Sequence, residues 1–379
     1  MFTKHEILTK YWGFENFRPG QENIVEAIVS GKDVLALLPT GGGKSLCYQL
    51  SGILRGRLTL VISPLISLMQ DQVKQLEEKG LKTACIYSGM SYREIDNILD
   101  NVRFGDYQFL YVSPERLKTS IFIERFKQMQ IGLIVVDEAH CISQWGHDFR
   151  PAYTKIHELR KFHLDTPVAA FTATATLETK LDIARELKLK NHEIHENSFE
   201  RKNIAYRIFR SSSKNKRLIE FCTSLKNSTG IVYCQTRKSV KEVTKLLKYN
   251  GLSCSSYHGG MDKEQREQSM HLWMSESIRV MVATNAFGMG IDKANVRYVL
   301  HYEISDSIEA YFQEAGRAGR DQKKAIALAF VEDSEIIALQ ELTDFKFPSE
   351  THVKKVYKAL CSTLRIAFGS GKDEVYDLD

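Results

Sequence analysis

A glycine-rich segment that ends in lysine and serine carries the residue types that bind phosphate. Residues 38–45 read Leu-Pro-Thr-Gly-Gly-Gly-Lys-Ser. Glycines let backbone N–H groups approach a polyphosphate closely, and the positive end of a following helix would face the same phosphates. Lys44 would then reach the terminal phosphate oxygens, and the hydroxyl of Ser45 would ligate magnesium. Taken alone, the segment also fits an ordinary glycine-rich turn, because Leu38 stands where the usual pattern has glycine.

Two adjacent carboxylates form a second candidate centre. Residues 133–140 read Leu-Ile-Val-Val-Asp-Glu-Ala-His. A buried strand that ends in acids delivers them to the carboxyl edge of a parallel sheet, where ligands bind. There Asp137 would hold magnesium through a water, and Glu138 would polarise the water that attacks the γ-phosphate. The alternative, two acids that begin a solvated turn, is disfavoured by their position behind a phosphate loop.

A pair of arginines forms the third centre. Residues 311–320 read Tyr-Phe-Gln-Glu-Ala-Gly-Arg-Ala-Gly-Arg. Arg317 and Arg320 lie three positions apart on a turn of small residues, which predicts that they project side by side into a cleft. If a second domain supplied them, they would neutralise charge on the transferring phosphoryl group. Spacing alone leaves a solvated basic turn equally open.

Aromatic and polar residues precede the phosphate loop, at 8–21. Phe14 is a candidate to stack on a purine, and the side-chain amide of Gln21 is a candidate to pair with its amino and ring-nitrogen edge. The alternative interpretation is a helical cap whose aromatic side chains close the first hydrophobic core.

Short apolar runs alternate with helical patterns and supply the elements that would position these centres. We expect helices at 46–54, 66–79 and 237–249, and two series of strands, at 34–38, 58–62, 84–87, 109–112, 133–136 and 168–171, then at 205–209, 230–234, 254–257, 279–283, 297–301 and 325–330. Strands joined by helical crossovers imply two parallel sheets covered on both faces. We therefore predict an α/β chain with domains at 1–199 and 200–335. A helical extension would follow at 336–379, with an amphipathic helix over 349–368.

Composition places few constraints on function. The net charge of +5 permits a polyanionic partner without requiring one. The seven cysteines include no CxxC pair, so neither a disulfide framework nor a zinc site is suggested. No signal peptide heads the chain, and no apolar run approaches the ~20 residues of a membrane span. We expect an intracellular protein, cytoplasmic or nuclear, without a membrane partner.

Together the motifs resemble those of superfamily 2 helicases and, within them, the RecQ DNA helicase family. The family's order is kept by PTGGGKS, SPLISLMQDQV at 63–73, DEAH at 137–140, FTATAT at 171–176, ATNAFGMGIDKANVR at 283–297 and QEAGRAGRD at 313–321. Two segments are specific to RecQ. Residues 8–21 are similar to its motif zero, and 141–151 are similar to its aromatic-rich loop. Leu38 also suits this family, whose fold implies two tandem RecA-like lobes with mostly parallel sheets.

The resemblance implies roles for individual positions. ATP and magnesium would be held by Phe14, Arg18, Gln21, Thr40, Gly41, Gly42, Gly43, Lys44, Ser45, Asp137 and Asp292, with Ser45 and Asp137 on the metal. Catalysis would involve Lys44, Asp137, Glu138, His140, Gln313, Arg317 and Arg320. DNA would contact Gln144, Trp145, His147, Phe149, Arg150, Arg237, His258, Thr284 and Asn285. Exposed aromatic side chains suit that last role, because they stack on any base without reading sequence.

From this resemblance we expect an ATP-dependent, monomeric core that translocates 3′→5′ on single-stranded DNA and unwinds 3′-tailed duplexes in DNA repair and recombination. Two alternatives stay open: an RNA-remodelling ATPase of the same superfamily, and a DNA-stimulated ATPase or scaffold with little unwinding. Fuller RecQ members carry a four-cysteine zinc domain and a winged helix after the second lobe. Here only Cys361 lies in the tail, so no zinc is expected, and the chain is either shortened or a zinc-free variant.

Overall fold

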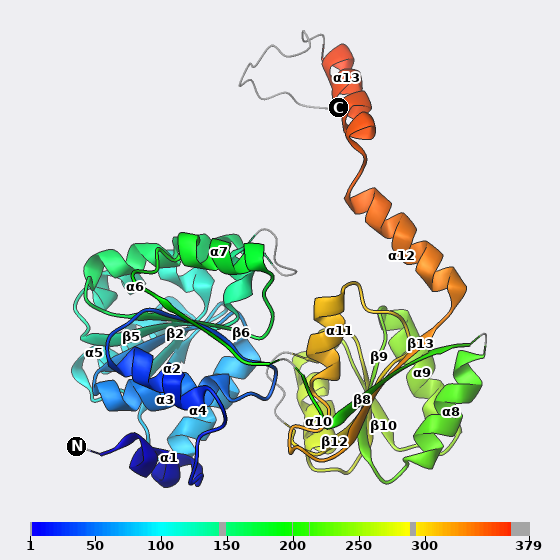
Figure 1. Ribbon diagram of the computed structural model, residues 1–379, viewed down its shortest axis with the longest axis horizontal. Coiled ribbons are helices and arrows are strands. Elements are labelled where there is room, and N and C mark those ends of the chain that lie inside the picture. Colours follow the sequence, from blue (N-terminus) through cyan, green and yellow to red (C-terminus); the bar gives the residue numbers. More distant parts are fainter. Residues whose placement is uncertain (1, 144–148, 199, 212, 289–292, 365–379) are drawn as a thin grey trace.

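The computed structural model describes residues 2–143, 149–198, 200–211, 213–288 and 293–364. Two α/β lobes lie side by side, and a pair of helices extends away from the second lobe (Figure 1). All strand pairs recorded among the described residues are parallel. The predicted fold class, two parallel-sheet lobes flanked by helices with a helical extension, is therefore confirmed.

The first sheet has the strand order β3-β4-β2-β5-β6-β1-β7. Its strands are β1 (Val34–Leu37), β2 (Leu58–Ile62), β3 (Thr83–Ile86), β4 (Phe109–Val112), β5 (Ile131–Val136), β6 (Val168–Thr172) and β7 (Glu193–Glu196). The central strands are fully buried and almost entirely apolar because both faces of the sheet are covered. The edge strand β7 was not predicted, because its sequence, Glu-Ile-His-Glu, is mostly polar and its side chains are only partly buried.

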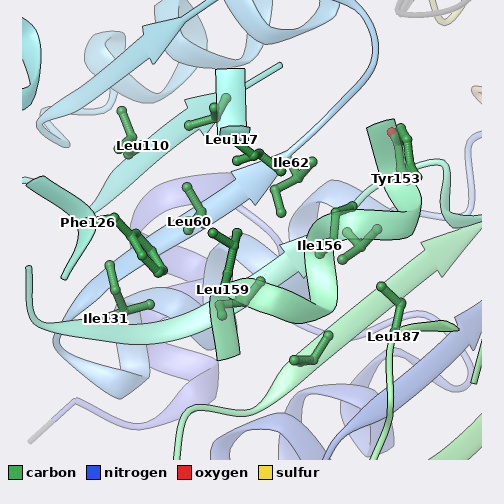
Figure 2. Close-up of a cluster of buried hydrophobic side chains, with 14 of the residues drawn as sticks. Leu60, Ile62, Leu110, Leu117, Phe126, Ile131, Tyr153, Ile156, Leu159 and Leu187 are labelled. Atoms are coloured by element: carbon green, nitrogen blue, oxygen red, sulfur yellow. The ribbon is translucent and has the colours of Figure 1, made fainter. Parts of the chain in front are cut away.

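Helices cover both faces of this sheet and form two cores. They are α1 (Lys4–Trp12), α2 (Gln21–Val29), α3 (Lys44–Arg55), α4 (Ile66–Glu78), α5 (Tyr92–Phe104), α6 (Ser120–Phe126), α7 (Leu177–Glu186) and the 3-10 segments η1 (Pro114–Lys118), η2 (Ala139–Ile142) and η3 (Pro151–Phe162). One core joins the sheet to α5, α6 and η3, as Figure 2 shows for Leu60, Phe126 and Ile156. The other joins it to α1–α4 and includes Tyr48 and Phe171.

The second sheet has the order β10-β11-β9-β12-β13-β8. Its strands are β8 (Ile204–Arg210), β9 (Thr229–Tyr233), β10 (Cys254–Tyr257), β11 (Val280–Ala283), β12 (Val296–His301) and β13 (Ala325–Val331), and its helices are α8 (Lys214–Ser224), α9 (Arg237–Tyr249), α10 (Lys263–Met274) and α11 (Ile308–Ala315). The helix predicted at 237–249 matches α9, which begins after a Thr236 cap.

Two further helices, α12 (Asp333–Lys346) and α13 (Glu350–Thr363), form the extension. Lys214 Nζ lies 2.5 Å from Glu335 Oε2, which ties the start of α12 to the second lobe. The amphipathic helix predicted over 349–368 is present as α13 within the described residues. On this helix Val353, Val356 and Leu360 are 40–51% exposed, whereas Cys361 is buried. Among the described residues, none of the helices has the length and apolar character needed to cross a membrane.

Candidate nucleotide-binding and nucleic-acid site

The phosphate loop links β1 to α3 and depends on glycine at two positions. Gly41 and Gly43 have φ values of +76° and +85°, a region that side chains other than glycine rarely adopt. A Cβ atom on Gly43 would also lie 2.2 Å from Nε2 of Gln21. The loop therefore presents a compact run of backbone N–H groups at the start of α3, as a polyphosphate site requires.

Two residues of the N-terminal segment hold this loop. Arg18 Nη1 donates to the carbonyl of Gly41 at 2.5 Å, and Gln21 Nε2 donates to the carbonyl of Gly42 at 2.9 Å. Gln21 Oε1 in turn accepts from the backbone N–H of Arg18 at 2.9 Å. The amide predicted to pair with adenine is thus bonded to the protein here. Adenine recognition by Gln21, Arg18 and the half-exposed Phe14 stays a prediction.

The carboxylates at the end of β5 lie beside the phosphate loop. Lys44 Nζ is 3.5 Å from Glu138 Oε1. Asp137 is buried, and its carboxylate accepts from the backbone N–H of Glu138 at 3.0 Å. Burial, followed by the negative charge of Glu138, raises the pKa of Asp137 to about 6, although Lys44 opposes the shift. The structure therefore brings the two predicted phosphate-chemistry centres of the first lobe together.

The backbone turns sharply after these acids, and two side chains stabilise the turn. Glu138 has a φ of +47°, and the hydroxyl of Tyr153 donates to the carbonyl of Asp137 at 3.0 Å. His140 Nδ1 lies 2.9 Å from Oγ1 of Thr172 and 3.4 Å from Oε2 of Glu138. Because the Thr172 hydroxyl donates to the Thr174 carbonyl, His140 Nδ1 is the donor toward Thr172. His140 thus connects the acids to the end of β6.

The donors near the phosphate loop fit magnesium. Ser45 lies in the first turn of α3, and Asp137 is a buried carboxylate whose raised pKa indicates a site that a cation would stabilise. A hydroxyl and a carboxylate are the protein ligands that magnesium uses when substrate phosphates complete its shell. In the part of the chain that the structure describes, no group of three or more His, Cys, Asp or Glu residues is arranged to hold a metal by itself.

The arginine turn follows α11 and touches the phosphate loop. A Cβ on Gly41 would lie 3.2 Å from Cγ of Arg320, and a Cβ on Gly316 would lie 3.3 Å from that of Thr40. Arg317 is instead buried in the second lobe and donates to the carbonyl of Gly288. This differs from the side-by-side projection expected from the spacing, because the chain bends between them at Gly319, whose φ is +56°.

Buried polar contacts hold α11, which carries the half-buried Gln313 and leads into that turn. Glu314 Oε2 accepts from His301 Nε2 at 2.8 Å and from Ser305 Oγ at 3.0 Å. His301 also stacks on Tyr233, whose hydroxyl donates to the Phe287 carbonyl at 2.6 Å. Neither His301 nor Tyr233 was predicted. The sequence offers one signal for this cluster, which is that the predicted strand at 297–301 ends in a histidine.

The predicted DNA contacts of the second lobe follow β9, β10 and β11 at the carboxyl edge of the sheet. Arg237 and Asn285 are exposed, whereas His258 and Thr284 are buried. Burial, and then the positive charges of Lys241 and Arg237, lowers the pKa of His258, so its imidazole is neutral at neutral pH. The Thr284 hydroxyl accepts from the backbone N–H of Ala286 at 3.4 Å. Arg237 and Asn285 are therefore the surface candidates.

The end of the aromatic-rich segment contacts the first lobe. Phe149 and Arg150 are half-buried, and Arg150 Nη1 donates to the carbonyl of Pro64 at 3.2 Å. Arg150 is thereby joined to the segment at 63–73. Gln144, Trp145, His147 and Asp292 lie outside the described residues, so their predicted roles stay predictions.

Comparison with known proteins defines the class. The DEAD/DEAH box helicase family matches residues 18–183, and the helicase conserved C-terminal domain matches residues 213–322. The solved structure of the DEAD-box helicase Mss116 bound to ssRNA and UDP-BeF is similar with a TM-score of 0.74. It is 18% identical, and the match covers 95% of this chain and 81% of that one, which shows a shared fold. The chain has the two-lobed architecture of a DEAD/DEAH box helicase.

Curated relatives identify the family. A probable ATP-dependent DNA helicase RecS of Bacillus subtilis is 43% identical over 89% of this chain and 70% of its own length. The ATP-dependent DNA helicase RecQ of Pasteurella multocida is 41% identical over 90% of this chain and 54% of its own length. The chain belongs to the RecQ family of DNA helicases, as its motifs predicted. It spans about half the length of this RecQ relative.

Proposed function

We propose that the chain is the core of an ATP-dependent DNA helicase, active in DNA repair and recombination, that converts ATP hydrolysis into 3′→5′ movement along single-stranded DNA. The observation that carries this proposal is the contact between the phosphate loop of one lobe and the arginine turn of the other, at Gly41 and Arg320. The first lobe would hold the nucleotide, and the second lobe would complete the catalytic site around it. Hydrolysis and lobe movement would therefore depend on each other.

Each lobe contributes defined groups to this reaction. Lys44 would bind the terminal phosphate oxygens, and Arg320 would neutralise charge that develops during transfer. Glu138 would accept a hydrogen bond from the attacking water and orient it. Ser45 and Asp137 would hold magnesium, which when bound neutralises the phosphates and keeps Asp137 ionised. The raised pKa of Asp137 supports this assignment, since a buried carboxylate at a catalytic edge is stabilised by a cation.

The same acids are connected to the proposed DNA-binding segments. Tyr153, in η3, donates to the Asp137 carbonyl, and Arg150 at the start of η3 reaches Pro64. His140 joins Glu138 to Thr172 at the end of β6. A DNA strand that displaces the aromatic-rich segment would therefore change the position of the Glu138 side chain. On the second lobe, Arg237 and Asn285 would contact the strand backbone.

We place the lobes at 1–199 and 200–335, with the extension at 336–379. Supporting this division, β7 ends the first sheet at Glu196 and β8 begins the second at Ile204. The monomeric state follows from the family resemblance alone and is tested by sedimentation.

DNA specificity is tested by ATP hydrolysis with single-stranded DNA or RNA of the same length and sequence. The proposal predicts stimulation by DNA well above that by RNA. Equal stimulation by RNA would favour an RNA-remodelling ATPase instead. Glu138→Gln, measured in parallel, is the control for contaminating ATPases.

A further inference from the structure

Arg201 lies in the short segment between β7 and β8, where the chain passes from one lobe to the other (Figure 1). Its guanidinium donates to four backbone carbonyls. Nη1 reaches Thr40 O at 3.0 Å and Gly316 O at 3.1 Å, while Nη2 reaches Ala318 O at 3.1 Å and Gly319 O at 3.0 Å. Thr40 belongs to the phosphate loop, and the other three belong to the arginine turn. One side chain thus bonds to both halves of the proposed catalytic site.

The arrangement requires arginine. A planar guanidinium presents its N–H groups in a rigid fork, so that each terminal nitrogen can donate to two acceptors, whereas a lysine ammonium is a compact point charge. Asn203 completes the support, because its Nδ2 donates to Gly319 O at 2.7 Å and to Lys323 O at 3.0 Å. Burial lowers the pKa of Arg201, yet arginine remains protonated at neutral pH. Neutral carbonyls therefore anchor a charged side chain at the junction of the lobes.

The four acceptors are divided unequally between the lobes. Three carbonyls move with the arginine turn, and one moves with the phosphate loop. If the lobes separate, only the bond to Thr40 has to break, and Arg201 stays in place on the turn. A single hydrogen bond of this kind is weak enough to form and break in each cycle, because water can replace the lost partner.

We propose that Arg201 is a positioning residue that sets the arginine turn against the phosphate loop when the lobes close. Arg201 touches neither reacting group. It acts through the backbone that immediately precedes Arg320, at Gly316, Ala318 and Gly319. Arg320 in turn lies against the phosphate loop, because a Cβ on Gly41 would be 3.2 Å from its Cγ. This inference rests on the proposed function, and it adds a residue outside the recognised motifs to the machinery that couples lobe closure to hydrolysis.

The first test is a double-mutant cycle on DNA-stimulated ATP hydrolysis. Arg201→Gln and Arg201→Lys should each lower kcat by about 10–100-fold, the range expected when catalytic groups shift by ~1 Å, while KM for ATP changes far less. In an Arg320→Ala background, Arg201→Gln should add less than about twofold, because the group it positions is gone. Lys202→Ala, at the exposed neighbouring position, is the matched control and should leave kcat unchanged. Additive losses, or unchanged kcat in both Arg201 variants, would overturn the proposal.

The second test does not depend on activity. Cysteines placed at Thr40 and Gly316 would have their Cβ atoms about 3.3 Å apart, close enough for a disulfide after a small adjustment. Oxidative cross-linking of Thr40→Cys/Gly316→Cys should be rapid with Arg201 present and slower in the Arg201→Gln background. The parent chain with its seven native cysteines is the blank. Equal cross-linking rates would refute the positioning role even if ATP hydrolysis proved not to need DNA.

Discussion

Lys44 and Glu138 form an ion pair across the phosphate loop, with Nζ and Oε1 3.5 Å apart and both side chains largely buried. Each of these residues has another task in the proposed reaction. A terminal phosphate would compete with Glu138 for Lys44, and a released Glu138 could then turn to the attacking water. Nucleotide binding and activation of the general base are therefore expected to be linked through this pair.

Glu138→Gln should keep nucleotide binding and lose turnover. The amide preserves the shape of the side chain but removes the negative charge that holds Lys44, so affinity should equal or exceed that of the wild type. Loss of a general base costs about 10²–10⁴-fold in rate. Lys44→Ala, in contrast, should abolish turnover and weaken nucleotide binding, since it removes a ground-state phosphate contact. A fluorescent nucleotide and a phosphate-release assay separate the two effects, and near-normal turnover in either variant would refute these roles.

The Asp137 carboxyl should make stability depend on pH. Its folded-state pKa of about 6 lies above the ordinary aspartate pKa of 3.8, so the folded chain binds this proton more tightly than the unfolded chain. The contribution of Asp137 to the free energy of unfolding therefore falls as pH rises from about 4 to 6. Above that range the carboxyl is ionised in both states and the full loss of stability remains. Asp137→Asn should raise the melting temperature at about pH 8, by an equivalent on the order of 1–3 kcal/mol, and change it little near pH 3.5. The opposite pH dependence would contradict the burial argument.

The two arginines of the turn should behave differently. Arg320→Ala should lower turnover on the order of 10³-fold with a smaller loss of ATP affinity and an unchanged melting temperature. Arg317 is buried and donates to Gly288 O, so Arg317→Ala should also lower the melting temperature. The free energy of unfolding should fall by about 1–3 kcal/mol, because the buried Gly288 carbonyl loses its donor. Melting curves and turnover measured together distinguish them. A stable Arg317→Ala variant beside an unstable Arg320→Ala variant would reverse the assignment.

A structural feature could be predicted here only where it requires particular residue types in the sequence. Buried strands such as Leu58–Ile62 and Phe109–Val112 were predicted to the residue, because burial on both faces demands a largely apolar run. The edge strand β7 was missed because it pairs with β1 alone and its side chains are mostly polar. No apolar run therefore marks it in the sequence. Arg201 was missed because its acceptors are backbone carbonyls, which any residue supplies. The different directions of Arg317 and Arg320 depend on the bend at Gly319 and on the bond from Arg317 to Gly288 O, neither of which their spacing encodes.

The aromatic-rich segment is predicted to couple DNA binding to the catalytic acids Asp137 and Glu138. Trp145→Ala should leave the melting temperature and basal ATP hydrolysis intact but strongly reduce stimulation by single-stranded DNA. Each lost stacking contact costs about 1–3 kcal/mol of base binding, so affinity should fall less than coupling. Tyr153→Phe, which removes only the bond to the Asp137 carbonyl, is a matched comparison on the adjoining segment. A core role for Trp145 would instead appear as a loss of roughly 3–5 kcal/mol of stability.

Strand displacement on a duplex with a 3′ single-stranded tail is the direct test of the proposed helicase activity. We expect the chain to displace the labelled strand only with hydrolysable ATP and magnesium, and a 5′-tailed duplex to be a poor substrate. Glu138→Gln should fail to displace the strand while still binding the tail. DNA-stimulated ATP hydrolysis without displacement of any tailed duplex would contradict the helicase assignment and leave a DNA-stimulated ATPase.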